Sequence, residues 1–274
     1  MTKTSMAVLK RLILLFIILG ITLPDSSSAA SPIPPIKVLG LNWGDASVQE
    51  IHQVLTSTAK QIFPFTKKEN WSPIIVKRSI KGPIVLFKKG KNGEYIVYLN
   101  TQDRYWCQYA FQFAHEIGHI ICGHHEENKR HLWFEETICE VASLFALFKL
   151  SKDWSESPPY PHLSSYANEF KKYATTRMQR RNTPKKFQLS SWYRQKKIFL
   201  QSNPTDFDRN LDIAKSLLPI FENNPSLWQA CQYLRFDQQN QYSFREYLQK
   251  WQARCQLPKN QDSIEGIKNL FGIQ

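Results

Sequence analysis

The stretch from Tyr105 to Cys122 constrains this chain more than any other part of its sequence. Glu116 carries the only formal charge in it, and two imidazoles, His115 and His119, stand at positions i and i+4. A helix places such positions on one face, so both rings project from apolar sequence in the same direction. Two surface histidines on an amphipathic helix are the alternative, which the apolar neighbours disfavour. The pattern therefore predicts a buried helix whose two imidazoles share one metal ion.

The segment before this helix carries the clearest strand pattern. Ile84–Phe87 and Tyr95–Leu99 are rich in β-branched and aromatic residues and flank a turn around Gly93. This is typical of a β-hairpin. We therefore expect an α+β fold, in which a hairpin or short sheet accompanies the two helices of the site and a helical region follows.

The helices follow from periodicity and end signals. Asp103 is expected to cap the motif helix, which runs from about Arg104 to Cys122, and Gly123 is expected to stop it. A second helix is predicted from Leu132 to Leu150. Further helices are predicted near residues 48–62, 164–180, 190–201, 206–222, 226–236, 243–255 and 263–271.

The second helix supplies the candidate third ligand. Glu136 and Glu140 are four residues apart and share a face of an otherwise apolar helix. Burying an unpaired carboxylate is costly, and a metal gives such residues a reason to be there. Glu136 is the expected ligand, and Glu140 is expected to hold a ligand histidine through its spare N–H. The alternative is that Glu135 and Glu136 simply favour the first turn of a helix.

Zinc suits this donor set, because neutral imidazole binds it well and a catalytic site keeps three protein ligands and an open position for water. Glu116 lies next to the first imidazole in sequence. It can accept a proton from the water that the metal makes acidic and pass it to a leaving amine. We therefore expect one Zn²⁺ per chain, held by His115, His119 and Glu136, with Glu116 as general base.

In this order of residues the chain resembles the gluzincin clan of zinc peptidases, which includes thermolysin and the one-zinc aminopeptidases. The resemblance covers roughly residues 80–150 and implies a zincin-like unit that hydrolyses peptide or protein substrates. It also implies that substrate lies extended along an edge strand, which would make Tyr95–Asn100 the rim of the cleft. Three residues after the second helix are candidates to stabilise the oxyanion, namely Tyr160, His162 and Tyr166.

A histidine six residues after His119 offers a rival third ligand. His125 stands where metzincins place their third histidine, but Cys122 occupies the position of their glycine. Met178 lies in a basic, helix-like context and does not provide their methionine turn. His124 is a weaker candidate than His125.

Five cysteines leave at least one thiol unpaired within the chain. Cys122 and Cys139 each stand three residues after a predicted ligand. They could bind the metal, join in a disulfide, or act as small buried apolar residues. Cys231 and Cys255 are expected to pair with each other, because they lie on adjacent predicted helices.

The first 30 residues resemble a secretory signal peptide. Lys3, Lys10 and Arg11 precede an apolar run, Leu12–Leu23, and small residues end at Ala30. This pattern predicts a cleaved signal and a secreted or periplasmic protein, with an uncleaved membrane anchor as the alternative. The expected organisation is a signal peptide over residues 1–30, a zincin-like unit over 31–157 and a helical region over 158–274.

The charge is positive overall and uneven. The formal net charge is +13, and residues 171–200 hold ten lysines or arginines and no acid. Such a segment attracts anionic surfaces. The alternative function is therefore a catalytically inactive zincin-like protein that binds anionic surfaces or partners through residues 171–200. Nucleic acid is not an expected partner, because the chain is expected to be exported.

Overall fold

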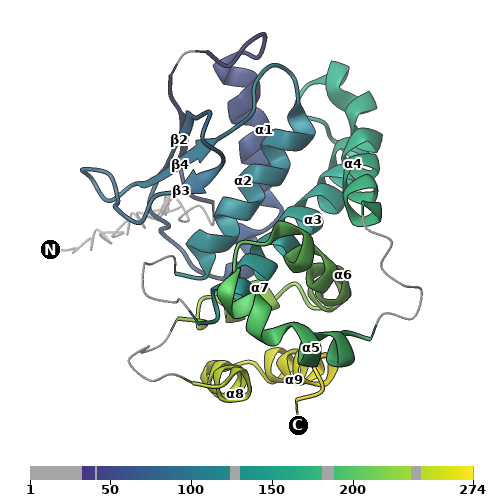
Figure 1. The fold of residues 1–274 in the computed structure, drawn as a ribbon. Coiled ribbons are helices and arrows are strands. Elements are labelled where there is room, and N and C mark those ends of the chain that lie inside the picture. The colour runs from purple at the N-terminus through teal and green to yellow at the C-terminus, as the bar shows by residue number, and fades with distance from the viewer. Residues whose placement is uncertain (1–32, 41, 124–129, 181–187, 236–241, 274) are drawn as a thin grey trace, which may run out of the picture. The chain divides into compact units, whose positions relative to one another are not determined.

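The structure is a computed structural model in which helices α1 (Val48–Lys60) and α2 (Trp106–Ile121) pack on one small sheet. The expected signal peptide lies outside the described residues and stays a prediction. Within the described residues the fold is mixed α+β, with nine α-helices, two 3-10 helices and four strands (Figure 1). The described residues are 33–40, 42–123, 130–180, 188–235 and 242–273.

The four strands form one sheet with the order β1-β2-β4-β3. β1, β2 and β4 are parallel, whereas β3 is antiparallel to β4. Val85 of β3 pairs with Val97 of β4, which confirms the predicted hairpin. The strands are β1 (Ile36–Val38), β2 (Ile74–Arg78), β3 (Ile84–Val85) and β4 (Tyr95–Leu99).

The open edge of the sheet is not the strand that the sequence indicates. β4 lies between β2 and β3, so the prediction that Tyr95–Asn100 rims the cleft is wrong. The hairpin folds its short first strand onto β4, and the Leu86 N–H donates to the Ile96 carbonyl at 2.9 Å. β3 is therefore the strand that borders the cavity described below.

Helix α2 (Trp106–Ile121) is the predicted motif helix, but its cap differs from the prediction. The N-cap residue is Tyr105, which makes no side-chain capping bond. Asp103 instead adopts a φ of 51°, and its Oδ1 accepts the N–H of Asp45 at 3.0 Å. Its carboxylate thus holds the preceding loop. Gly123 follows the helix with a φ of 80°, as expected for a residue that ends it.

Helix α3 (Leu132–Glu156) continues past its predicted end at Leu150. It packs against α2, α4 and α6, and this central position explains why it is apolar on nearly all sides. The expected boundary after residue 157 coincides with the C-cap of this helix, Ser157, and stays a prediction.

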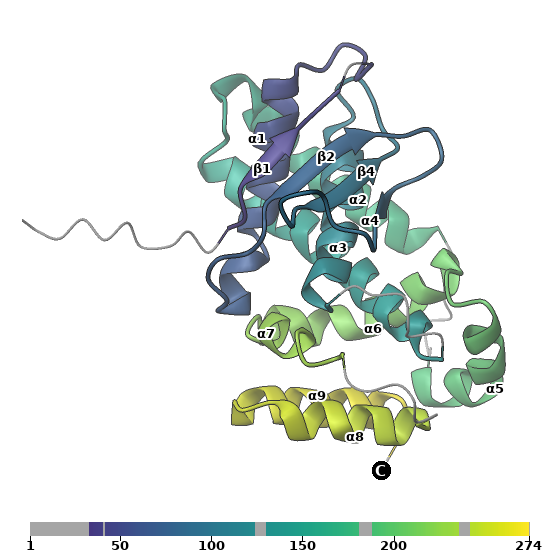
Figure 2. The same cartoon turned by 90° about the vertical axis from the view of Figure 1, so that its left-hand side faces the viewer.

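The other helices lie where periodicity predicts them, with shifted ends. Helix α1 (Val48–Lys60) begins with a capping box, in which Ser47 and Glu50 each accept the other's backbone N–H. In Figure 2, α8 and α9 run side by side, and they pack against each other. None of the described helices has the combined length and apolar character needed to cross a membrane. The remaining elements are α4 (Ala167–Gln179), α5 (Leu189–Ser202), α6 (Phe207–Asn223), α7 (Leu227–Cys231), α8 (Phe244–Arg254), α9 (Pro258–Leu270) and the 3-10 helices Phe63–Thr66 and Pro161–Tyr166.

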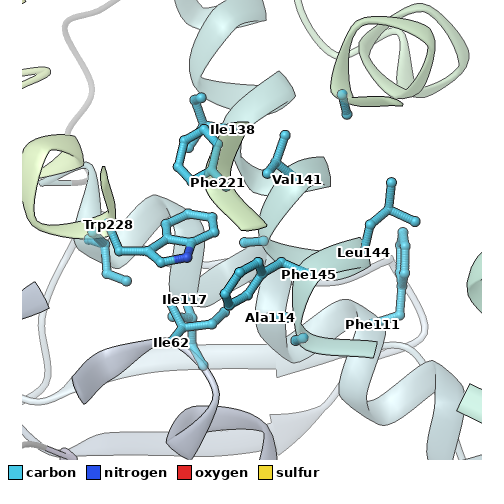
Figure 3. Close-up of a cluster of buried hydrophobic side chains, with 14 of the residues drawn as sticks. Ile62, Phe111, Ala114, Ile117, Ile138, Val141, Leu144, Phe145, Phe221 and Trp228 are labelled. Atoms are coloured by element: carbon cyan, nitrogen blue, oxygen red, sulfur yellow. The ribbon is translucent and has the colours of Figure 1, made fainter. Parts of the chain in front are cut away.

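The core beneath the site is built from four helices. Ile117 of α2, Phe145 of α3, Phe221 of α6 and Trp228 of α7 are fully buried (Figure 3). The ring of Trp228 lies 4.5 Å from that of Phe221 and 5.5 Å from that of Phe145. This aromatic packing fixes α3 against its neighbours and therefore fixes the carboxylates that α3 carries.

Helices α2 and α3 approach each other closely at Gly118. A Cβ atom at this position would lie 2.9 Å from both Cα and Sγ of Cys139. Such contacts are too short for any side chain, so this crossing requires glycine. Gly118 lies between the two histidines in sequence, and Cys139 lies one turn after Glu136. The close crossing therefore brings the carboxylate of Glu136 to the imidazoles.

The five cysteines all lie in described residues, and all are buried free thiols. The expected pairing of Cys231 with Cys255 is therefore wrong, and Cys122 is not joined to Cys139. The Cys255 thiol donates to the carbonyl of Trp251 at 3.3 Å instead. All five thiols thus lie buried without a disulfide.

Candidate metal centre

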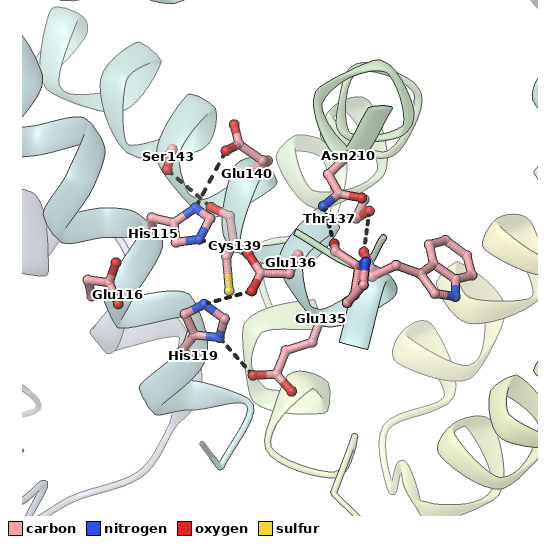
Figure 4. Close-up of polar contacts among 12 residues, drawn as sticks. His115, Glu116, His119, Glu135, Glu136, Thr137, Cys139, Glu140, Ser143 and Asn210 are labelled. Atoms are coloured by element: carbon pink, nitrogen blue, oxygen red, sulfur yellow. Dashed lines mark hydrogen bonds and ion pairs between the residues drawn. The ribbon is translucent and has the colours of Figure 1, made fainter. Parts of the chain in front are cut away.

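Two imidazoles of α2 face a single carboxylate of α3 (Figure 4). The Nε2 atom of His115 lies 3.2 Å from Oε2 of Glu136, and the Nε2 atom of His119 lies 3.7 Å from Oε1 of the same residue. All three side chains are buried. The structure thus brings together the three residues that the sequence predicts as metal ligands.

Two further carboxylates stand behind the imidazoles. The Nδ1 atom of His115 lies 3.6 Å from Oε1 of Glu140, the residue expected there. The Nδ1 atom of His119 lies 2.8 Å from Oε1 of Glu135. A carboxylate on the far ring nitrogen fixes the tautomer and orientation of a ligand histidine. The His119 ring is therefore held from behind by a hydrogen bond, whereas Glu140 lies behind the His115 ring without one.

The contact of Glu135 with His119 was not predicted from the sequence. The i, i+4 pattern selects Glu136 and Glu140, and it gives Glu135 no role beyond a charge in the first turn. Consecutive helix residues are about 100° apart around the axis, so Glu135 is not on the same face. It reaches His119 because α2 and α3 cross closely. The sequence signal for this contact is a second glutamate, Glu135, directly before the predicted ligand Glu136 in an otherwise apolar segment.

Cys139 is a second candidate for the third ligand. Ligand atoms of His115, His119 and Cys139 all lie within 4.8 Å of one another. Burial raises the pKa of the Cys139 thiol, which favours its protonated form in the absence of a metal. We favour Glu136, because both Nε2 atoms face its carboxylate, whereas the Cys139 thiol is hydrogen-bonded to the His119 ring and packs beside Gly118.

The charges of the cluster suit a cation. Glu116, Glu135, Glu136 and Glu140 are all buried around the two imidazoles. Both carboxylate oxygens of Glu140 are buried, and neither has a hydrogen-bond partner among the described residues. Four buried carboxylates and two imidazoles lack sufficient positive charge, which a divalent ion would supply. The donor set of nitrogen and carboxylate oxygen is one that zinc accepts.

The pKa values of the cluster are shifted because its carboxyl and imidazole groups are buried close together. Burial raises the pKa of both Glu116 and Glu140. Burial alone would lower the pKa of His115, but the hydrogen bond and charge of Glu136 outweigh it, so the pKa is raised. Without a metal, protons are therefore held in this cluster more firmly than in water.

Glu116 stands on the side of the cluster that borders the sheet. Its Oε2 atom accepts the backbone N–H of Val85 in β3 at 2.7 Å. In an antiparallel pair, neighbouring residues direct their N–H groups to opposite sides of the strand. The Leu86 N–H bonds to β4, so that of Val85 points away from β4 and toward Glu116. The sheet edge therefore positions the candidate base.

The cluster opens into a cavity of about 620 Å³, a size typical of ligand-binding pockets. Its walls come from β3, α2, α3, α4 and the start of α6, and they include His115, Glu116, His119 and Glu136. Phe207 is 54% exposed, and its ring lies 6.2 Å from that of His115. The cavity thus joins buried polar groups to an accessible apolar wall.

The three expected oxyanion residues do not line this cavity. Tyr160 stacks on His162 with 5.5 Å between ring centroids, and the Tyr166 hydroxyl donates to the carbonyl of Arg104 at 3.3 Å. They belong to the segment between α3 and α4, which contributes no residue to the cavity lining. Tyr173 and Arg177 of α4 line the cavity instead.

Two further predictions concern residues that lie wholly or partly outside the described residues. The rival ligands His124 and His125 lie outside the described residues. So do Arg181, Lys185 and Lys186 of the basic segment. In its described part, Lys171, Lys172, Arg180, Arg194 and Lys197 are exposed.

Comparisons of the chain with protein-family models, with curated proteins and with solved structures found no match.

Proposed function

We propose that this chain is an exported, zinc-dependent metallopeptidase. The observation that carries the proposal is the convergence of two Nε2 atoms on the carboxylate of Glu136. Glu135 supports the His119 ring from behind, and Glu140 lies behind the His115 ring. The resemblance to gluzincins, which rests on the order of His115, Glu116, His119, Glu136 and Glu140, supports the same class.

His115, His119 and Glu136 would hold the zinc ion, with Cys139 as the alternative third ligand. A bound zinc ion would supply a Lewis acid that makes water acidic and polarises a carbonyl group. The cavity contacts the three ligand residues and leaves room for a substrate beside them. This arrangement is typical of catalytic zinc sites, which keep one position open.

Glu116 is the proposed general base. Its Oε1 atom would accept a proton from water and deliver it to the leaving amine, while its Oε2 atom is held by the Val85 N–H. Burial raises the pKa of this carboxyl group, which makes it a better proton acceptor. The edge strand β3 would align an extended peptide along the cavity, where Ile84 and Phe87 are exposed.

Glu116→Gln tests the proposal. The variant should retain about one zinc per chain, since Glu116 is not a proposed ligand, and should lose hydrolysis of a peptide library by at least about a hundredfold. His115→Ala should lose both zinc and activity. The matched control is Glu69→Gln, because Glu69 is exposed and outside the cavity. Full activity in Glu116→Gln would contradict the mechanism, and a wild-type protein that cleaves no peptide would contradict the function.

A further inference from the structure

A guanidinium group lies in the wall of the cavity. Arg177, in the last turn of α4, lines the cavity together with His115, Glu116 and Tyr173. Its Cζ atom lies 3.8 Å from the ring centroid of Phe111. Stacking on an aromatic ring holds a guanidinium group in place without using any of its N–H donors. The stacking thus fixes the guanidinium group of Arg177 at the cavity and leaves its N–H donors available for hydrogen bonds.

The hydrogen bonds of this side chain are incomplete. The Nε atom of Arg177 is buried, and no acceptor contacts it among the residues that the structure describes. A buried N–H group without an acceptor is costly, and native proteins seldom keep one without a reason. An acceptor supplied by a bound molecule would complete the site.

Arg177 and Glu140 both line the cavity, but their side chains are not hydrogen-bonded to each other. Neither oxygen of Glu140 has a hydrogen-bond partner among the described residues, and neither does the Nε atom of Arg177. Arg177 is directed to the cavity, with Phe111 beneath it.

The spacing along α2 relates Arg177 to the proposed reaction. Phe111 lies four residues before His115, which is about 6 Å along the helix axis. An extended peptide advances about 3.3 to 3.6 Å per residue. The guanidinium group above Phe111 is therefore within about two residues of a peptide bond placed beside His115 and Glu116.

We propose that Arg177 binds a carboxylate group of the peptide substrate, one or two residues from the bond that is cleaved. This inference rests on the proposed peptidase function and names its substrate class. Guanidinium groups match carboxylates because both are planar and form two parallel hydrogen bonds. The carboxylate can come from the C-terminus of the peptide or from an aspartate or glutamate side chain. A C-terminal source would make the enzyme remove residues from the end of peptides.

The test uses three pools of octapeptides labelled with an uncharged BODIPY dye, which adds no carboxylate. The first has free C-terminal carboxylates and no acidic side chains, the second has the same sequences as C-terminal amides, and the third adds one aspartate or glutamate to the amides. The zinc-loaded wild-type protein should cleave the first or the third pool at least about tenfold more efficiently than the second, as expected for a charge-assisted pair. Preference for the first pool identifies the C-terminus, and preference for the third identifies side chains.

Variants assign the preference to the residue. Arg177→Met keeps a stem that can cover Phe111 but removes the donors, so it should abolish the preference mainly through a higher KM. Arg177→Lys keeps a charge without the planar fork and should retain part of the preference. Arg180→Met makes the same charge change at an exposed position outside the cavity and should behave like the wild type.

Binding to the Glu116→Gln protein separates this inference from the proposed function. Fluorescence anisotropy should show the same preference for carboxylate-bearing peptides, and its loss in the Glu116→Gln, Arg177→Met double variant. Absence of any cleavage by the wild type contradicts the peptidase function but leaves this binding measurement intact. Equal binding of all three pools, or a preference that survives Arg177→Met, overturns the role of Arg177.

Discussion

The Nδ1 atom of His119 lies 2.8 Å from Oε1 of Glu135. The next residue, Glu136, faces the Nε2 atom of the same ring. Two consecutive carboxylates of α3 therefore contact the two nitrogens of one imidazole. A ring held in this way keeps its orientation whether or not a metal is bound, which prepares it to act as a ligand.

Glu135→Ala should weaken zinc binding by about 10- to 100-fold, because His119 loses the group that fixes its orientation. Glu135→Gln retains an oxygen acceptor for Nδ1 and should recover most of the affinity. Competition with a zinc chelator measures both values, and Glu69→Ala is the control at an exposed site. Wild-type affinity in Glu135→Ala would show that the contact does not position the ligand.

Glu136→Ala should lose zinc, whereas Cys139→Ala should retain about one zinc per chain. The reason is that both Nε2 atoms face Glu136, whereas the Cys139 thiol is hydrogen-bonded to the His119 ring. Metal analysis after gel filtration measures the stoichiometry, and the shift in Tm on adding zinc gives a second readout. The reverse pattern of retention would assign the third ligand to Cys139.

Gly118→Ala should lower the free energy of unfolding by about 1 to 3 kcal/mol, because the added methyl group meets the backbone and sulfur of Cys139 at 2.9 Å. Zinc affinity should fall with it, since α2 and α3 must separate. Gly266→Ala in α9 is the matched control, because its added Cβ would have no atom within 4 Å beyond the nearby backbone of its own helix. Denaturant unfolding should show the control slightly more stable than the wild type, by about 0.5 to 1 kcal/mol. Equal stability of both variants would show that the crossing is not tight.

His131 should make the protein less stable as the pH falls below about 6.5. Its ring is packed 4.7 Å from that of Tyr247, and its Nε2 atom donates to the carbonyl of Tyr242 at 2.9 Å. Burial lowers its pKa in the folded state, so the unfolded chain binds the proton more readily as the pH decreases. His131→Gln retains a donor but does not titrate, so it should lack this loss.

The measurement is the free energy of unfolding of the zinc-loaded wild type and of His131→Gln between pH 8 and pH 5.5. The difference between the two should change by no more than about 1.4 kcal/mol per pH unit, the limit for one proton. His131 is the N-cap residue of α3, so its protonation would loosen the start of the helix that carries Glu135 and Glu136. A difference independent of pH would exclude this role.

Local sequence determined much of the candidate centre. A helical period of 3.6 residues places His115 and His119 on one face of their helix. The same period places Glu136 and Glu140 on one face of the following helix. Strand alternation and a turn at Gly93 were sufficient to predict the hairpin, which the structure confirms. These features depend on residues close in sequence, so periodicity alone reveals them.

Only the tertiary structure decided which groups complete that centre. Glu135, Val85 and Arg177 are distant in sequence from the histidines or lie off the predicted face, and they reach the site through the packing of α3, β3 and α4 on α2. The edge of the sheet and the pairing of Cys231 with Cys255 were mispredicted for the same reason. Strand order and thiol pairing depend on which segments meet in space, and local periodicity carries no information on that.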